Sequence, residues 1–205
     1  MIYTKFYTLP PYNKKEIFRY AGVGTPSAEL EKTLDMCLAK CEKVFSGKIC
    51  YIKVPIEISG NEIDFGFAKV KSKNLAANLK NCREAIIFAA TVGIEIDRLI
   101  RKSVQINMAE AVWFGAIGDE RVETLCDLFS NEVEAECRKE LKITKPRFSA
   151  GYGDLDLTFQ KDIFNVLECH KLIGITLTES LLMSPSKSVS AIIGIEEKKD
   201  ENSVK

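Results

Sequence analysis

The chain has 205 residues, of which 46% are hydrophobic and 28% charged, a composition typical of one globular domain with a substantial core. Its 29 basic side chains are balanced by 29 acidic ones, so no strong electrostatic field would attract nucleic acid or an anionic membrane. The N-terminus lacks the apolar segment of a signal peptide, and no apolar run reaches the ~20 residues of a membrane span, so we expect a cytoplasmic protein.

Two helices and a strand are expected in the first quarter of the chain. The segment "KKEIFRYAG" predicts a helix that ends at Gly22. A second helix is expected to begin after Thr25, which can cap it, and to continue to about Phe45. In residues 50–58 apolar and polar side chains alternate, which predicts a strand with one buried face, and Pro55 favours an edge strand.

The middle of the chain continues this mixed order. Residues 63–67 predict a second strand, in a hairpin with the first, and residues 72–82 predict a short helix. The unbroken apolar run "AIIFAATVG" predicts a strand that is covered on both faces. Helices are then expected through "IEIDRLIRKS" and over residues 108–140, where Gly115 and Gly118 could break or kink the second helix.

The last part of the chain completes the predicted fold. After a glycine-rich turn, a helix is expected with Asp154 or Asp156 as its cap, followed by a final strand over residues 188–195. The order lacks the βαβ alternation of a parallel doubly wound sheet and predicts an α+β fold with a mainly antiparallel sheet. We expect a single domain over residues 1–195 and a charged, disordered tail over residues 196–205.

Seven cysteines could form disulfides or a metal site, but no C-x-x-C pair occurs. The closest pair, Cys37 and Cys41, lies on the apolar stripe of an expected helix. We therefore expect reduced cysteines that pack as small hydrophobic side chains, and no metal site.

Common catalytic motifs are absent from the sequence. The single histidine, His170, falls at the end of an expected helix, and no P-loop, H-E-x-x-H or G-x-S-x-G motif occurs. The segment "GVGTPS" matches a dinucleotide-binding loop only in part, because Ser27 replaces its third glycine. "ECHKLIG" approaches the D-x-H-x-x-G box of cobalamin-binding domains, but Glu168 replaces the aspartate and the glycine comes one place late. We therefore expect no catalytic residues for acid–base chemistry.

The segment "RFSAGYGDLDLTFQ", which begins at Arg147, combines an arginine, two glycines, a tyrosine and two aspartates. In one interpretation Arg147 pairs with Asp154 or Asp156, and the glycines adopt positive φ in a turn before a helix. In the other, these residues bind a ligand, because a guanidinium suits a carboxylate and a glycine lets the backbone approach closely.

Two motifs resemble one known family. They are the R-x-x-x-G-Y turn at Arg147 and the L-T-E-S-x-x-M-x-P-x-x-S-V-S segment over residues 177–190. With "FRYAGVG", "AIIFAATVG" and "GDERVET", these segments are similar to the reactivation domain of cobalamin-dependent methionine synthase, and most closely to its short stand-alone relatives. The second motif fixes many positions in order, so a chance match would be rare.

The resemblance implies a C-shaped α+β domain with a twisted antiparallel sheet that binds S-adenosylmethionine in a shallow groove. By this analogy Arg147 contacts the carboxylate of the ligand and Glu123 its ammonium group. Gly151 and Tyr152, with Ala150 beside them, supply backbone and ring contacts. Charge complementarity supports these roles. A planar guanidinium binds a carboxylate through two parallel hydrogen bonds, and a carboxylate pairs with an ammonium group.

The resemblance also implies a mechanism that needs no acid or base from this chain. A cob(II)alamin is reduced by one electron, from a flavodoxin-like or ferredoxin-like donor, and then takes the methyl group of S-adenosylmethionine. The chain lacks a cobalamin box, so the corrinoid is expected on a separate, cobalamin-binding methionine synthase chain. The protein alone is then expected to turn over no substrate.

The sequence departs from the family at three places. In the full-length enzymes the turn after Arg147 continues into a stretch that contains proline and cysteine, whereas here it reads "GDLDL". An N-terminal aspartate that contacts the ligand in the full-length enzymes has no clear counterpart in "TLPPYNKKEIF", and a later tyrosine pair is also missing. Two alternatives therefore stay open. The protein could be a binding or scaffolding module that has lost the ligand, or a reactivator of a different corrinoid methyltransferase.

Overall fold

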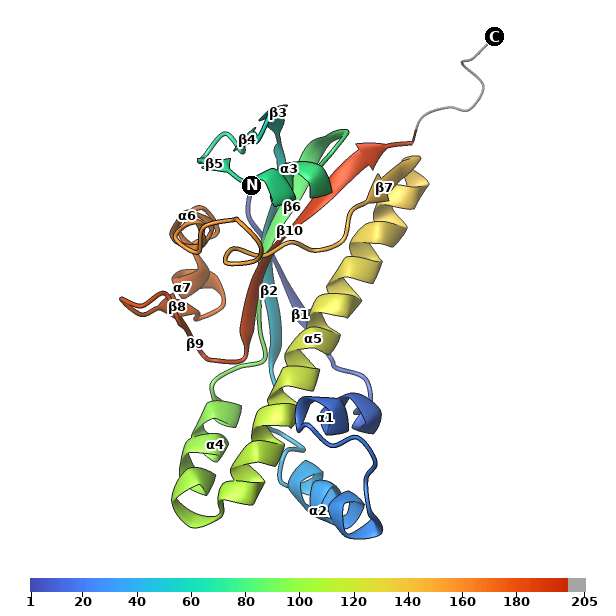
Figure 1. Cartoon of the computed structure of the whole chain (residues 1–205), viewed down its shortest axis with the longest axis vertical. Coiled ribbons are helices and arrows are strands. Elements are labelled where there is room, and N and C mark those ends of the chain that lie inside the picture. The colour runs from blue at the N-terminus through green and yellow to red at the C-terminus, as the bar shows by residue number, and fades with distance from the viewer. Residues whose placement is uncertain (199–205) are drawn as a thin grey trace.

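A five-stranded antiparallel sheet organises the chain, in the order β1-β2-β6-β10-β7. The structure is a computed structural model, and it describes residues 1–198 (Figure 1). The strands of this sheet are β1 (Tyr3–Tyr7), β2 (Gly47–Pro55), β6 (Cys82–Thr91), β7 (Lys142–Thr144) and β10 (Ser188–Glu197).

Two smaller antiparallel sheets accompany the central one. They are a three-stranded sheet in the order β3-β4-β5 and the hairpin of β8 and β9. Their strands are β3 (Glu57–Ser59), β4 (Glu62–Asp64), β5 (Lys69–Lys71), β8 (Thr176–Leu177) and β9 (Met183–Ser184). The α+β class with antiparallel pairing is thus confirmed.

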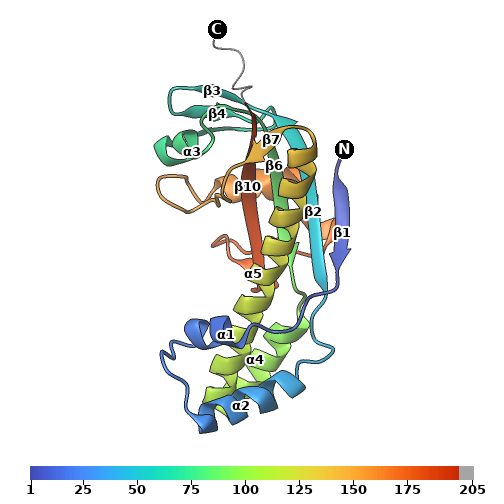
Figure 2. The same cartoon turned by 90° about the vertical axis from the view of Figure 1, so that its right-hand side faces the viewer.

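The seven helices within residues 1–198 lie on the two faces of the central sheet and beyond one of its ends. In both views α1, α2 and α4 gather at one end of the molecule, and α5 runs from there along the sheet to β7 (Figures 1 and 2). The helices are α1 (Lys14–Tyr20), α2 (Ala28–Ala39), α3 (Lys73–Asn78), α4 (Glu95–Ile106), α5 (Met108–Lys139), α6 (Phe159–Val166) and α7 (Cys169–Leu172).

Each face of the central sheet is covered by its own hydrophobic core. One core packs against α1, α2, α4 and α5, and the other against α3, α6, α7 and the β3–β4 hairpin. In β6, Ile86 and Phe88 belong to the first core, whereas Ala85 and Ile87 belong to the second. The prediction that this strand is covered on both faces is therefore confirmed.

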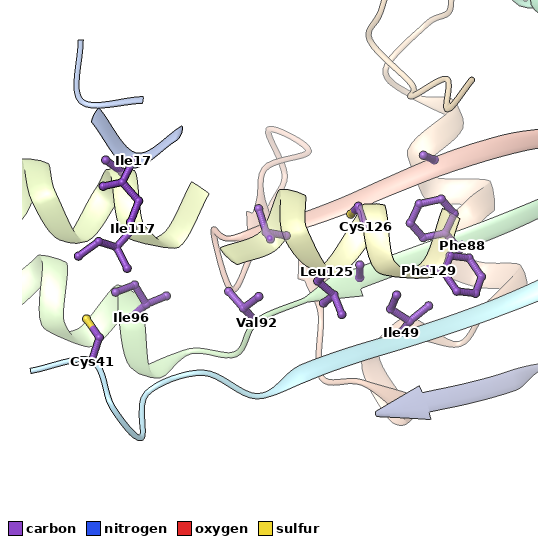
Figure 3. Packing of buried hydrophobic residues seen from close by; sticks show 14 of the residues in the cluster. Ile17, Cys41, Ile49, Phe88, Val92, Ile96, Ile117, Leu125, Cys126 and Phe129 are labelled. Carbon is purple, nitrogen blue, oxygen red and sulfur yellow. The ribbon is translucent and has the colours of Figure 1, made fainter. Parts of the chain in front are cut away.

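The helix α5 packs directly on β6. The rings of Phe129 and Phe88 lie 5.0 Å apart, and both residues are fully buried (Figure 3). Burial of each such side chain contributes about 1.5–3 kcal/mol to the free energy of unfolding. This contact holds the middle of α5, which carries the residues of the site described below, against the sheet.

The helix α5 is one unbroken element of 32 residues, so its glycines do not break it. Asn107 caps its start by accepting from the backbone N–H groups of Ala109 and Glu110. Gly118 leaves room for a neighbour, because a Cβ there would lie 2.9 Å from Cγ of Lys187. The small residue therefore permits close packing rather than a break.

The prediction that β2 is an edge strand is wrong. It lies between β1, a strand that the sequence analysis missed, and β6. β1 pairs only with residues 47–51, however, so β2 has no neighbour on that side at Pro55. The missing N–H of the proline therefore breaks no pairing with β1.

The expected caps and the end of the last strand also need correction. The N-cap of α2 is Ser27, not Thr25, and the N-cap of α6 is Thr158, whose side chain makes no capping bond. The strand β10 continues to Glu197, two residues beyond the expected end. The remainder of the expected tail, apart from Lys198, lies outside the described residues.

All seven cysteines are buried and free, as expected for packing residues. Within residues 1–198, no group of three or more His, Cys, Asp or Glu side chains is arranged to hold a metal ion. In the same part of the chain, no helix is both long and apolar enough to cross a membrane.

Candidate functional site

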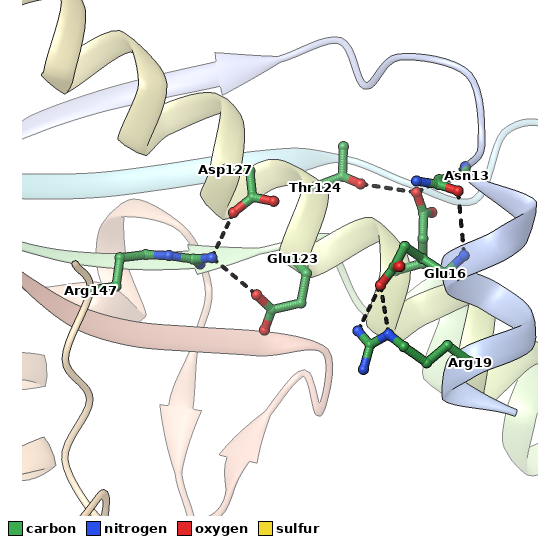
Figure 4. A network of polar contacts seen from close by, with 8 residues as sticks. Asn13, Glu16, Arg19, Glu123, Thr124, Asp127 and Arg147 are labelled. Carbon is green, nitrogen blue, oxygen red and sulfur yellow. Dashed lines mark hydrogen bonds and ion pairs between the residues drawn. The ribbon is translucent and has the colours of Figure 1, made fainter. Parts of the chain in front are cut away.

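Three charged side chains from two parts of the chain meet beside the central sheet. Nη2 of Arg147 donates to Oδ1 of Asp127 over 2.7 Å and to Oε2 of Glu123 over 3.2 Å (Figure 4). Both carboxylates project from α5 one turn apart, because residues separated by four positions share a helix face. The structure thus brings together two of the residues proposed from the resemblance, Arg147 and Glu123, and adds Asp127.

The position of Arg147 follows from how the chain leaves β7. The N–H of Phe148 donates to the carbonyl of Ile192 over 3.0 Å, and the N–H of Ile192 donates back over 2.8 Å. The segment therefore runs beside β10 as an extended chain whose side chains alternate. The side chain of Phe148 enters the second core, and that of its neighbour Arg147 reaches α5 on the other side.

A cavity of about 380 Å³ lies at this ion pair, within the usual size range of small-molecule sites. The side chains of Arg147, Glu123 and Asp127 are 25%, 42% and 65% exposed, so the cavity opens to solvent. Charged groups that are this exposed can exchange partners without the large desolvation penalty of a buried pair. The cavity is lined by Glu123, Pro146, Arg147, Ser149, Val189 and Ala191.

The turn after Arg147 has the shape that its glycines permit. Gly151 and Gly153 adopt φ values of +84° and +58°, which disfavour residues with a Cβ. The N–H of Gly151 donates to the carbonyl of Leu155 over 2.9 Å, which closes the turn, and Leu155 is buried. The turn is therefore a fixed element rather than a loose connection.

The other residues proposed from the resemblance lie in or beside this turn. Tyr152 is 68% exposed, and its ring meets the edge of Phe148 with the centroids 5.3 Å apart. Ala150 is partly buried against the second core. Neither residue, nor Gly151, is among those that line the cavity at Arg147, whose wall on this side is Ser149.

The interpretation that Arg147 pairs with Asp154 or Asp156 is wrong. Asp154 accepts from the hydroxyl of Ser72 and, at 2.8 Å and 3.1 Å, from the first backbone N–H groups of α3. These bonds hold the pKa of Asp154 below its ordinary value, with the Ser72 hydroxyl as the main cause. Asp156 instead accepts from the N–H of Thr158 over 2.7 Å.

The thiol of Cys126 is near enough to the guanidinium of Arg147 to interact with it, and it stays protonated. Burial raises the pKa of Cys126 to about 12, although Arg147 acts in the opposite direction. Cys126 is fully buried on α5 between the two carboxylate-bearing positions. It therefore serves as a packed surface under the site rather than as a nucleophile.

The sequence model for the activation domain of vitamin B12 dependent methionine synthase matches residues 77–204, which is more than half of the chain. The chain belongs to this family. The match includes α5, the turn and β10, so all the residues of the site described above fall within it. Among curated protein sequences none matches.

A crystal structure of the MetH reactivation domain bound to AdoHcy is similar to this activation domain over 98% of the chain and 80% of its own length. The TM-score is 0.72 and the sequence identity is 16%. At this identity the match shows a shared fold.

The second sequence motif reaches the site through β10. The N–H and the hydroxyl of Ser186 donate to the carboxylate of Asp97 on α4 over 2.7 Å and 2.6 Å. Nζ of Lys187 is 2.6 Å from Oδ1 of Asp119 on α5. These bonds fix the start of β10 against both helices, and Val189 follows in the wall of the cavity.

A second charged cluster in the activation domain was missed by the sequence analysis. Arg121 and Glu120, both only 2% exposed, form an ion pair with two N···O distances of 2.5 Å. Arg121 also donates to the carbonyls of Pro10 and Pro11, at 2.6 Å and 3.3 Å, and stacks on the ring of Tyr12. This cluster ties the N-terminal segment to α5. Nothing in the sequence "GDERVET" distinguishes these two charges from exposed ones.

Proposed function

We propose that this chain binds S-adenosylmethionine at the site of Glu123 and Arg147. In this role it supports reductive methylation of cob(II)alamin on a separate, cobalamin-binding methionine synthase chain in the cytoplasm. The observation that carries the proposal is the contact between Arg147 and Glu123, which are 24 positions apart in the sequence and meet in a cavity next to a fixed glycine turn. Membership of the activation-domain family supports the same conclusion.

The amino-acid part of the ligand suits this pair because it carries one charge of each sign. In the structure Glu123 pairs with Arg147, which Asp127 also contacts. When the ligand binds, its carboxylate pairs with the guanidinium of Arg147 and its ammonium group pairs with the carboxylate of Glu123. Each charged group therefore keeps a partner of opposite charge. The planar guanidinium fixes the direction of the ligand by binding both carboxylate oxygens.

The turn provides the remaining contacts in this proposal. In this proposal Gly151 offers its backbone carbonyl, the small side chain of Ala150 lets the ligand approach the turn, and the exposed ring of Tyr152 covers the ligand. The chain then contributes position and electrostatics, and no proton has to move. The protein alone is therefore expected to turn over no substrate.

In this proposal the reactive cofactor would be a corrinoid on the partner chain, and this chain would hold only the methyl donor, through Arg147 and Glu123. With one electron from a flavodoxin-like or ferredoxin-like donor, the corrinoid would supply the nucleophile that accepts the methyl group of the sulfonium, and S-adenosylhomocysteine would be the leaving group. A sulfonium is a good leaving group, which explains why the site needs no general acid.

Calorimetric titration of the purified chain tests the binding step. We expect saturable binding of S-adenosylmethionine and S-adenosylhomocysteine, and weaker binding of 5′-methylthioadenosine, which lacks the amino-acid part. Absence of binding by all three would contradict the proposal and favour a module that retained the fold without the ligand.

A reconstitution assay tests the role in reactivation. An inactivated methionine synthase chain that carries cobalamin is mixed with this protein, S-adenosylmethionine and a one-electron donor, and methionine formation is followed. We expect activity to return only when all components are present. Recovery with another corrinoid methyltransferase instead would identify a different partner.

A further inference from the structure

Arg147 is held by two carboxylates that differ in distance and exposure. Asp127 accepts from Nη2 over 2.7 Å and Glu123 over 3.2 Å, and the side chain of Asp127 is the more exposed of the two. The shorter contact is therefore made by the residue that does not line the cavity.

This asymmetry has a consequence for the proposed function, on which the inference rests. A ligand ammonium that binds Glu123 draws this carboxylate away from Arg147. The arginine side chain has several rotatable bonds, and a guanidinium that loses its partner loses its fixed direction as well. The contact with Asp127 can persist, because Asp127 lies one helix turn further along α5, outside the wall of the cavity.

We propose that Asp127 is a positioning residue that keeps the guanidinium of Arg147 in place while Glu123 pairs with the ligand. The hydrogen bond occupies one N–H of Nη2 and leaves other N–H groups of the guanidinium to bind the ligand carboxylate. Asp127 thus acts through Arg147 and does not touch the ligand.

The negative charge of Asp127 has an opposite effect as well, because it repels the ligand carboxylate. The side chain of Asp127 is 65% exposed, so water and salt screen this repulsion. A hydrogen bond of 2.7 Å to a guanidinium that is only 25% exposed is screened less. Positioning therefore outweighs repulsion, and removal of Asp127 weakens binding.

Two variants of Asp127 separate the hydrogen bond from the charge. Asp127→Ala removes both, whereas Asp127→Asn keeps an oxygen that can accept from Nη2. The matched control is Glu134→Ala, because Glu134 lies on the same helix and makes a comparable contact of 2.6 Å with an exposed arginine, Arg138. Each protein is titrated with S-adenosylmethionine and with 5′-methylthioadenosine.

We expect Asp127→Ala to weaken binding of S-adenosylmethionine about threefold to tenfold, as for one partly exposed ion pair. Asp127→Asn should recover part of this loss. Glu134→Ala should bind like the unchanged chain. The affinity for 5′-methylthioadenosine should be the same in all four proteins, since this probe lacks the carboxylate that Arg147 binds.

Three results would overturn the inference in distinguishable ways. Unchanged or tighter binding by Asp127→Ala, when the unchanged chain binds, would show that Asp127 does not position Arg147. An equal loss for both probes would show a general structural role. If the unchanged chain binds neither probe, the proposed function fails and this inference fails with it.

Discussion

The helix α5 carries two charged clusters within about two turns, and they differ in what surrounds them. Glu120 and Arg121 are almost fully buried, and the backbone of the N-terminal segment completes their hydrogen bonds. Glu123 and Asp127 meet Arg147 at an open cavity, where each side chain is at least 25% exposed. The same residue types thus serve structure in one place and are available for a ligand in the other.

Burial decides the role of these ion pairs more than their chemistry does. A buried pair has already lost its hydration, so removal of one partner leaves a charge without compensation. An exposed pair keeps much of its hydration and contributes about 0–1 kcal/mol, so a ligand can replace it at small cost. The following variants test this distinction.

The largest effect is expected for Arg121→Ala. The change leaves the carboxylate of Glu120 buried and unpaired, and should lower the free energy of unfolding by about 3–5 kcal/mol. Denaturation by guanidinium chloride measures it, with Arg138→Ala as the exposed control, expected to change stability by at most about 1 kcal/mol. A similar loss of unfolding free energy in Arg121→Ala and Arg138→Ala would contradict the distinction between buried and exposed pairs.

The next effect is a loss of affinity in Arg147→Ala. If the guanidinium binds the ligand carboxylate, the change should weaken S-adenosylmethionine binding by about 2–4 kcal/mol, roughly thirtyfold to a thousandfold. The free energy of unfolding should change by no more than about 1 kcal/mol, since the pairs of Arg147 are partly exposed. Arg147→Lys should restore affinity only in part. Full affinity in a folded Arg147→Ala protein would end the assignment.

A smaller effect is expected for Gly153→Ala in the turn. A Cβ at this position would lie 2.3 Å from Nδ2 of Asn74, and φ is +58°, so we expect a loss of about 1–2 kcal/mol in stability. Thermal melts compare it with Gly24→Ala, where a Cβ would meet nothing within 4 Å. Equal melting temperatures of the two variants would show that the turn is not fixed.

The smallest effect concerns acid stability and Asp154. Its pKa is lower in the folded chain than its ordinary value of 3.8, so the folded state favours the charged form. This stabilisation is present above pH 3.8 and is lost as the pH falls from there through the lower folded pKa. Asp154→Asn should therefore flatten the fall in melting temperature below about pH 4. The control is Glu179→Gln, which lies in an exposed loop. If the melting temperature of Asp154→Asn falls with acid as steeply as that of the unchanged chain, this role of Asp154 is contradicted.

Much of the fold could be predicted from hydrophobic patterns. The apolar run of β6 indicated a strand between two layers, and apolar residues at helical spacing indicated the helix α5. Contacts with the core determine both patterns. The strand β1 was missed because it is short and no residue in it is fully buried. The position of β2 was misjudged because pairing partners depend on the register of distant strands, which Pro55 alone does not reveal.

The site could be predicted only in part. The resemblance pointed to Arg147 and Glu123, which the structure brings into contact. Asp127 could not be found, since its contact with Arg147 depends on how the segment after β7 lies across α5. Glu120 and Arg121 were missed because their burial is created by the N-terminal segment, more than 100 positions away in the sequence.

The strand order has a consequence for folding during synthesis. β6 lies in the middle of the sheet, yet one of its two neighbours, β10, begins 97 positions after Thr91 at the end of β6. At a typical rate of about 5–20 residues per second, the ribosome needs about 5–20 seconds to make this stretch. For this time the most apolar strand of the sheet has an unpaired edge, which is the kind of surface that other chains can join. A nascent chain of this protein is therefore most prone to aggregate before β10 emerges, when the helices already made can cover the faces of β6 but not its free edge.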